Sequence, residues 1–331
     1  MSKIKRQTLV DALARLQPGL SNKDIIQGSQ AFNFHGSHII TFNDLISVSV
    51  PLETGIEGAV KADDLHKLLS RITADEVELI QTEAELQVRA GRIRAGLSLD
   101  TQKLPHPGIE NEWLDLPPQF KEATSFCQFS TSKDMTRPHL TCIHYEGVNV
   151  SSSDRFRITQ FIMTEPVPVD FLLPAPAANA LLKYEVTHMA LDPAWIHFAD
   201  CESGLIFSAR RILAELIKPD QYFEVEGDKV QLPDLAKTLE RARVMTEADT
   251  DLDLTIRVEL HPSKLICRGQ KEIGWIQEEI DLVYQGEPRV MLINPIFLVD
   301  ILSRTKDMIV SENMALFLGE NFKHVMLLVK E

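Results

Sequence analysis

The chain has 331 residues, a net charge of −14 and 44% hydrophobic residues, which is too long for one ordinary core and apolar enough for compact domains. No apolar run approaches the roughly 20 residues of a membrane span, and the first residues lack the apolar stretch of a secretory signal. The four cysteines (Cys127, Cys142, Cys201 and Cys267) have no paired spacing, so we expect reduced thiols in a cytoplasmic protein, without a disulfide framework.

The predicted elements repeat three times, at intervals of about 110 to 120 residues. In each repeat an amphipathic helix leads into alternating strands, a second helix and further strands. The first helices are expected over residues 8–16, 120–129 and 235–245, and the second helices over residues 63–72, 175–184 and 295–304. This succession predicts an α+β fold of three similar domains, each with two helices and antiparallel sheets, over residues 1–110, 111–221 and 222–331.

The first repeat shows the pattern most clearly. Leu9, Leu13 and Leu16 recur at helical spacing and define one buried stripe. Alternating segments predict strands over residues 31–34, 39–42, 45–50, 76–81, 85–90 and 93–99. Residues 103–118 are rich in proline and polar side chains, which indicates an extended linker to the second repeat.

The later repeats carry the same signals. Strand pairs are expected over residues 140–144 with 149–152, and over residues 256–260 with 265–268. Asn294 and Pro295 are typical of the cap and first turn of a helix. The last predicted strand, over residues 325–329, is strongly apolar.

The negative charge is unevenly distributed. Windows around the six predicted helices carry roughly +7, which leaves roughly −21 elsewhere. A segregated charge of this kind could attract the phosphate backbone of nucleic acid to the helices. Ordinary solvated helix faces give a similar count, and both interpretations stay open.

Four groups of residues, in order along the chain, match a known family pattern. They are residues 57–65 with 90–94, residues 136–140 with 153–158, residues 239–243, and residues 284–287 with 293–302. Together they resemble the bacterial sliding clamp, the β subunit of the replicative DNA polymerase, over essentially the whole chain. The chain departs from the family at Arg155 and Phe156, which replace a Gly-His pair, and in a shortened stretch after Asp220. Such departures are typical of a divergent clamp, including one that a bacteriophage encodes.

The resemblance implies a DNA polymerase processivity factor. Clamps of this family are head-to-tail homodimeric rings whose helices line a central hole, although no local motif here specifies two subunits over three. A ring that slides must hold the phosphates of duplex DNA without regard to sequence, through lysine and arginine. The candidate DNA-facing residues are Arg6, Lys23, Arg71, Lys133, Arg137, Lys183, Lys237 and Arg241. Each of them also fits an ordinary solvated surface position.

The resemblance also implies a pocket for short, mostly apolar peptides of DNA polymerase and clamp loader. Its expected lining is Leu140, Ser153, Arg155, Phe156, Arg157, Ile158, Asn294, Phe297, Val325, Leu327 and Val329. Without the resemblance, strand core would be the simpler interpretation of the aliphatic members of this set. Arg155 and Phe156 should reshape one side of the pocket and alter the choice of partner.

An enzyme is the main alternative class. The histidines are scattered, and His35 and His38 have no acidic or cysteine partners at metal-site spacing. The sequence contains neither a P-loop nor a dinucleotide fingerprint, and Ser151–Asp154 lacks the nucleophile elbow. We therefore expect no catalysis, no cofactor and no metal. A non-ring DNA-binding or scaffolding protein built from the same domains remains the alternative function.

Overall fold

The computed structural model describes residues 2–23, 26–101 and 106–329. Its internal contacts divide the chain into two compact units. Unit 1 comprises Met1–Pro118 with Val167–Leu213, and unit 2 comprises Gln119–Pro166 with Ala214–Glu331. Each unit therefore combines segments that are distant in the sequence.

Unit 1 contains three helices among its described residues, α1 (Arg6–Arg15), α2 (Ala62–Arg71) and α4 (Ala175–Leu181). Its long antiparallel sheet has the order β5-β2-β3-β4-β16-β15-β14-β9, and a smaller sheet has the order β1-β6-β7-β8. The strands of these sheets are β1 (Ser2–Lys5), β2 (Ala31–His35), β3 (His38–Phe42), β4 (Ile46–Pro51), β5 (Glu57–Lys61), β6 (Glu76–Gln81), β7 (Glu85–Ala90), β8 (Ile93–Ser98), β9 (Leu114–Asp115), β14 (His188–Leu191), β15 (Trp195–Asp200) and β16 (Leu205–Arg210). The strand β13 (Phe171–Pro174) also falls in unit 1 but in neither of these sheets.

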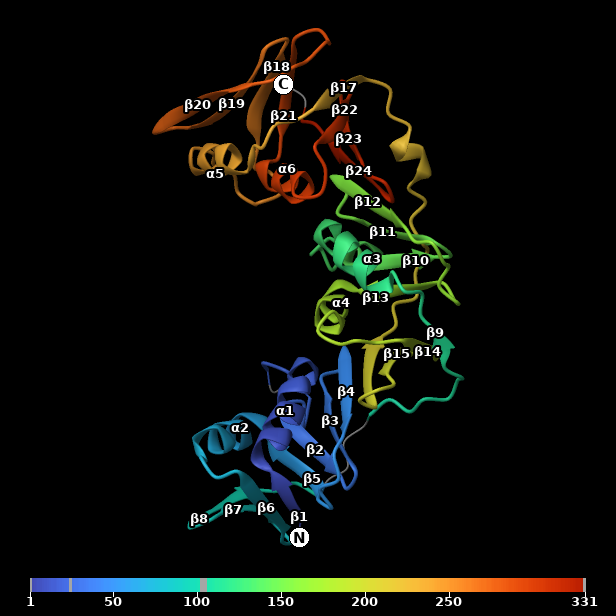
Figure 1. Ribbon diagram of the computed structural model, residues 1–331, viewed down its shortest axis with the longest axis vertical. Helices are drawn as coiled ribbons and strands as arrows, with labels where there is room; N and C mark the ends of the chain where they lie inside the picture. The colour runs from blue at the N-terminus through green and yellow to red at the C-terminus, as the bar shows by residue number, and fades with distance from the viewer. Residues whose placement is uncertain (1, 24–25, 102–105, 330–331) are drawn as a thin grey trace. The chain divides into compact units, whose positions relative to one another are not determined.

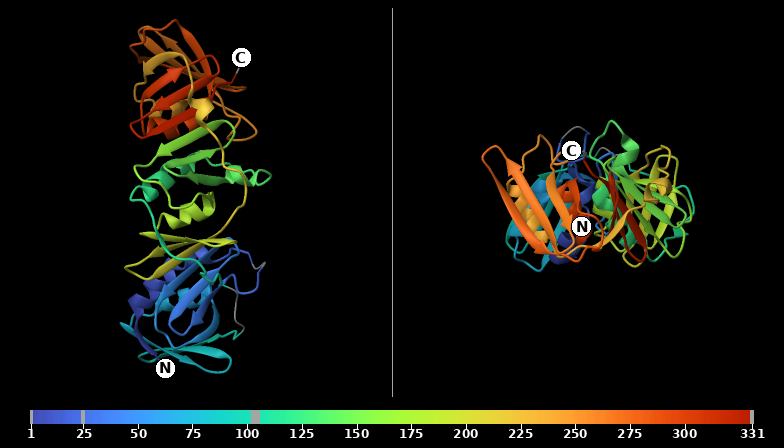
Figure 2. Two further views of the ribbon diagram at one scale, coloured as in Figure 1. Left: turned by 90° about the vertical axis from the view of Figure 1, so that its right-hand side faces the viewer. Right: turned by 90° about the horizontal axis from the view of Figure 1, so that it is seen from above.

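The pairing of β4 with β16 makes the long sheet of unit 1 continuous, with Val48 opposite Phe207. Figures 1 and 2 show this junction as blue strands beside yellow strands. The helix α1 buries Leu9 and Leu13 as the stripe predicts, and its last turn is fixed by Arg15, whose guanidinium lies 3.1 Å from the Asp200 carboxylate. Burial of this apolar stripe is the main stabilising contribution of the helix.

Unit 2 contains α3 (Phe120–Cys127), α5 (Ala236–Val244) and α6 (Pro295–Leu302) among its described residues. Within unit 2 the strands of the long sheet follow the order β10-β11-β12-β24-β23-β22-β17, and a smaller sheet has the order β20-β19-β18-β21. The strands are β10 (Cys142–Glu146), β11 (Asn149–Ser153), β12 (Arg157–Ile162), β17 (Asp228–Gln231), β18 (Ile256–His261), β19 (Lys264–Lys271), β20 (Gly274–Asp281), β21 (Arg289–Ile293), β22 (Asp307–Val310), β23 (Met314–Leu318) and β24 (Phe322–Leu327).

The pairing of β12 with β24 joins distant segments in unit 2, with Ile158 opposite Val325. In Figure 1 the green β12 lies beside the red β24, and α3 and α6 lie on one side of this sheet. The rings of Phe126 and Phe322 pack 4.4 Å apart and fill that side. On the sheet, Val325 belongs to a separate buried cluster with Phe223. The sheet of unit 2 is thus covered by helices on one face and by a chain segment on the other.

The predicted α+β class with antiparallel sheets is confirmed, and all six predicted helices are present with shifts of a few residues at their ends. The strand expected from residue 140 begins at Cys142, because Pro138–Thr141 forms a 3-10 helix. Of the linker expected over residues 103–118, residues 103–105 lie outside the described residues, and Leu114–Asp115 forms β9. The domain boundaries expected from the repeat stay a prediction. Within the described ranges, no helix combines the length and apolar character needed to cross a membrane.

Candidate functional site

A groove of about 660 Å³ lies in unit 2, where β12 and β24 meet a chain segment that runs past their ends. Its floor comes from the strands and its wall from residues 215–222. The residues that line it are Leu140, Ser153, Arg155, Phe156, Arg157, Ile158, Glu215, Leu216, Ile217, Lys218, Pro219, Gln221, Tyr222, Met314, Val325, Met326 and Leu327. This mixture of aliphatic and aromatic surface with a few charged groups suits a short apolar peptide.

The groove brings together most of the residues that the sequence predicted for a peptide pocket. These are Leu140, Ser153, Arg155, Phe156, Arg157, Ile158, Val325 and Leu327. Val325 is buried, whereas Leu327 is 49% exposed and offers an apolar contact surface. Strand core therefore describes Val325 but not Leu327.

Three of the predicted residues do not line the groove. Asn294 caps α6, with its side-chain oxygen accepting hydrogen bonds from the backbone N–H groups of Ile296 and Phe297 at 2.9 and 3.3 Å. The ring of Phe297 packs against a guanidinium instead, and Val329 forms a β-bridge with Leu292. Phe297 therefore reaches the groove only through Arg157, and Asn294 has a capping role.

Sequence reasoning missed the wall of the groove, residues 215–222, and also Met314 and Met326. The wall has neither helical nor strand periodicity, so pattern analysis places it among the linkers. Two signals could have found it. Leu216 and Ile217 belong to an apolar run over residues 212–217 that only Glu215 interrupts, and Pro219 precedes the 3-10 helix Asp220–Phe223.

The wall is held against the rest of unit 2 at two points. At its C-terminal end, the adjoining Phe223 packs into the cluster with Leu316 and Val325. At the second point, the backbone N–H of Ile217 donates a hydrogen bond to Nδ1 of His144 at 3.1 Å. The Nε2 atom of the same ring donates a hydrogen bond to the backbone carbonyl of His139 at 2.7 Å. These two bonds require a neutral imidazole with its proton on Nε2. Burial lowers the pKa of His144 to about 4, so the ring stays neutral at physiological pH.

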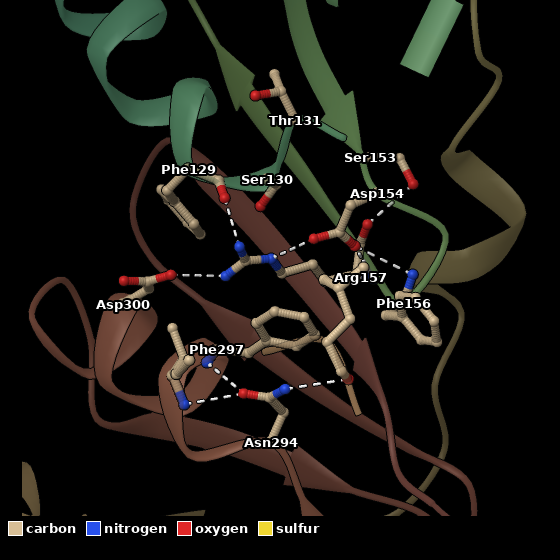
Figure 3. A network of polar contacts seen from close by, with 12 residues as sticks. Phe129, Ser130, Thr131, Ser153, Asp154, Phe156, Arg157, Asn294, Phe297 and Asp300 are labelled. Atoms are coloured by element: carbon tan, nitrogen blue, oxygen red, sulfur yellow. Dashed lines mark hydrogen bonds and ion pairs between the residues drawn. The ribbon is translucent and has the colours of Figure 1, made fainter. Parts of the chain in front are cut away.

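Arg157 organises the helix side of β12 beneath the groove (Figure 3). Its guanidinium donates to Asp154 at 2.9 Å, to Asp300 at 2.7 Å and to the carbonyl of Phe129 at 2.5 Å. The ring of Phe297 lies 3.9 Å from the guanidinium carbon. This one side chain therefore ties β12 to α6, and it supports strands that carry the groove.

The turn before β12 holds an unusual backbone conformation. Arg155 has φ +82°, in the left-handed region that favours glycine. The turn is fixed by Asp154, whose side-chain oxygen accepts hydrogen bonds from the backbone N–H groups of Phe156 and Arg157 at 3.1 and 3.0 Å. The Gly-His pair of the resemblance matches this geometry, and the chain adopts it with an arginine instead.

Replacing Arg155 with glycine should therefore leave the turn intact and raise the free energy of unfolding by up to about 1 kcal/mol, because strain in the left-handed region is relieved. Urea unfolding followed by circular dichroism measures the change. Arg137 is the matched control, since it has φ −127° in an exposed loop. Arg137→Gly should lower stability by roughly 0.5 to 1 kcal/mol through backbone entropy. Destabilisation by both substitutions would contradict the assignment of strain to Arg155.

The predicted DNA-facing residues lie on or beside helices in both units. In unit 1, Arg6 begins α1, Lys23 follows the α1 region, Arg71 ends α2 and Lys183 follows α4. All of these except the half-buried Arg6 are exposed.

In unit 2, the predicted Lys133 and Arg137 occupy the loop after α3, and Lys237 and Arg241 lie one turn apart on α5. All are exposed. Arg241 is held by Glu278 through two hydrogen bonds of 2.9 and 2.6 Å, so much of its charge is compensated within the chain. Lys237 is therefore the stronger DNA candidate on this helix.

No family model matches the chain, and no curated protein matches it by sequence. The structure is similar to that of the DNA polymerase sliding clamp from Bacillus subtilis, with a TM-score of 0.86 at 15% identity over 99% of this chain and 98% of that one. The DNA polymerase III beta chain from Streptococcus pneumoniae gives 0.86 at 16% identity, covering 99% of both chains. The same values describe a sliding clamp, DNA polymerase III subunit beta, from Bartonella birtlesii bound to griselimycin. The chain thus has the fold of the bacterial DNA polymerase sliding clamps over its full length.

Proposed function

We propose that the chain is a sliding clamp, a ring that encircles duplex DNA and tethers DNA polymerase and other replication proteins. The observation that carries the proposal is the groove of unit 2, at the position where the resemblance expects the partner-peptide pocket. A clamp of the same fold has been solved with griselimycin bound, which fits a pocket for a peptide ligand. The protein would act by tethering and without catalysis, because attachment to a threaded ring raises the effective concentration of polymerase at its template.

The ring needs a seam, and each unit supplies an exposed sheet edge for it. The strand β8 ends the small sheet of unit 1 and carries Arg94 and the exposed Ile93. The strand β20 ends the small sheet of unit 2, with Trp275 at 61% exposure and Ile273 beside it at 82%. Open apolar edges favour pairing with another chain. Pairing of β8 in one copy with β20 in the next gives a head-to-tail homodimer, with three domains per chain over residues 1–110, 111–221 and 222–331.

Charge supports the same pairing of edges. The β8 edge is basic, with Arg92 and Arg94, whereas the β20 region is acidic, with Glu272 and Asp281. Opposite charge at two edges steers them toward each other and disfavours like-with-like association. A closed ring would place its helices around DNA, where exposed residues such as Lys23, Arg71 and Lys237 can contact phosphates irrespective of sequence. Its place of work would be the bacterial cytoplasm, or an infected cell if a phage encodes it.

Peptide binding tests the groove directly. Replacing Leu327 with glutamate should weaken the binding of a fluorescein-labelled, Leu- and Phe-bearing polymerase peptide by at least about tenfold, because the charge must be desolvated against the ligand. Fluorescence anisotropy measures the affinity. Val283, which is 85% exposed and does not line the groove, is the matched control, and Val283→Glu should bind like the unmodified protein. Equal affinity of both variants would place the peptide elsewhere.

A further inference from the structure

Unit 1 contains a chain of three polar side chains that the clamp function does not use. The Sγ atom of Cys201 lies 3.1 Å from Nδ1 of His188, and Nε2 of His188 lies 3.0 Å from a carboxylate oxygen of Asp115. We propose that Cys201 is a reactive thiol that forms mixed disulfides with small disulfide compounds, with His188 as the base that takes its proton.

Two strands and a turn of unit 1 bring the three residues together. In the register of the strands, His188 pairs with Asp115 on β9 and with Ala199 on β15. Cys201 begins the turn that follows β15, and from there its Sγ reaches Nδ1 of His188. The arrangement therefore depends on β9, which adds part of the predicted linker to the edge of the sheet, and not on sequence proximity.

The hydrogen bonds determine which nitrogen of His188 acts as the base. A carboxylate only accepts hydrogen bonds, so the contact with Asp115 fixes the proton on Nε2. The other nitrogen, Nδ1, then presents its lone pair to Cys201 and to the hydroxyl of Thr187 at 2.8 Å. Since the two outer residues bind opposite nitrogens of one ring, the cluster has the form of a proton relay. In the described part of the chain, no group of three or more His, Cys, Asp and Glu side chains is arranged to hold a metal ion.

A second chain of three side chains in unit 1 resembles this cluster but is buried from solvent. Ser208, His197 and Asp192 form the same kind of chain at 2.8 and 3.0 Å, but His197 is 0% exposed and no reagent can reach the serine. That buried chain is structural, because Asp192 also accepts hydrogen bonds from linker residues such as Asn111. Cys201, in contrast, is exposed.

The other thiols are poor competitors for a reagent. Cys127, Cys142 and Cys267 are all buried. Burial raises the pKa of Cys142 and of Cys267 to about 12, which keeps both as neutral thiols. Among the four cysteines of the chain, only Cys201 combines access to solvent with a basic neighbour.

The reaction is a thiol–disulfide exchange. The Cys201 S–H gives its proton to Nδ1 of His188, and the thiolate attacks one sulfur of a disulfide R–S–S–R. The S–S bond of the reagent breaks as the new bond to Cys201 forms, and the departing R–S⁻ takes up a proton from the imidazolium or from water. The reagent is reduced by the same two electrons that oxidise Cys201, and Asp115 stabilises the transient imidazolium.

Titration of the full chain with 5,5′-dithiobis(2-nitrobenzoic acid) tests the proposal. One thiol per chain should react rapidly, Cys201→Ser should abolish that phase, and Cys267→Ser should leave it unchanged. His188→Gln should slow the fast phase by about tenfold at neutral pH while Cys201 remains exposed. Mass spectrometry after treatment with oxidised glutathione should locate the single adduct at Cys201.

A fast phase that survives in Cys201→Ser, or that is unchanged in His188→Gln, would overturn the proposal. The pH–rate profile of the unmodified protein gives a test that needs no variant. The base predicts reactivity that persists below the ordinary thiol range, whereas a single rise near a pKa of about 8.5 would show an exposed but unassisted cysteine.

Discussion

Replacing Arg157 with alanine is expected to lower the free energy of unfolding by about 3 to 5 kcal/mol, because it leaves a buried carboxylate without its partner. The Asp154 side chain is 4% exposed and that of Asp300 is 32% exposed, so Asp154 bears most of the cost. The substitution also removes the guanidinium that lies against Phe297. Urea unfolding followed by circular dichroism measures the loss.

Arg155 provides the control for Arg157 two positions away, with the same charge but an exposed side chain. Arg155→Ala should change stability by no more than about 1 kcal/mol, because the side chain is exposed and alanine has the same cost as arginine in the left-handed region. Arg157→Lys should recover little, because an ammonium cannot reproduce three separately directed contacts. Similar small losses for Arg155→Ala and Arg157→Ala would show that the network does not stabilise unit 2.

Acidification is expected to destabilise unit 2 as the pH falls from about 6.5 toward 4, through His144. The unfolded chain takes up a proton at the ordinary pKa of histidine, whereas the folded chain resists because burial holds the pKa of His144 at about 4. Stability from this group is therefore complete above the unfolded pKa and is lost progressively as the pH approaches the folded one. The difference between the two values corresponds to about 3 kcal/mol.

Protonation of His144 would also act on the groove. A protonated Nδ1 cannot accept the N–H of Ile217, so the wall of the groove loses one of its two attachments. The direct measurement is an NMR titration of the His144 ring, which should show a pKa of about 4. His144→Gln keeps a donor and an acceptor without titrating, and it should flatten the dependence of stability on pH. An ordinary histidine pKa, or an unchanged pH dependence in the variant, would contradict this account.

Other buried histidines also lower the stability of the fold as the pH falls. The variant His144→Gln separates their effect from that of His144. Burial places the pKa of His324 well below its ordinary value, and it also lowers that of His197 against the opposing effect of Asp192. Both remain in His144→Gln, so the difference between the two proteins isolates the contribution of His144.

The helices could be predicted from sequence because local periodicity defines them. The stripe of Leu9 and Leu13 and the capping pair Asn294–Pro295 report local physics that tertiary contacts did not override. The strand pairings β4 with β16 and β12 with β24 join residues more than a hundred positions apart, and no local signal encodes them. These two pairings could therefore be identified only from the structure.

The residues that line the groove could be predicted only in part. Its strand residues, such as Ile158 and Leu327, lie in motifs that the resemblance identifies, whereas the wall containing Ile217 is irregular and is positioned by contacts with His144 and Phe223. Arg155 illustrates a further limit. A sequence pattern indicates glycine at this turn, and only the backbone angle shows that arginine adopts the same conformation.

Retention on DNA tests encirclement most directly. The protein would be loaded with its clamp loader onto nicked circular duplex DNA, freed of unbound protein, and followed before and after one cut linearises the circle. We predict that it stays on the circles and leaves once free ends exist. We also predict that Trp275→Arg, which removes an exposed apolar side chain from the β20 edge and repels the basic β8 edge, is not retained on either form of DNA. Equal loss from circular and linear DNA would show binding by affinity alone and would contradict the ring.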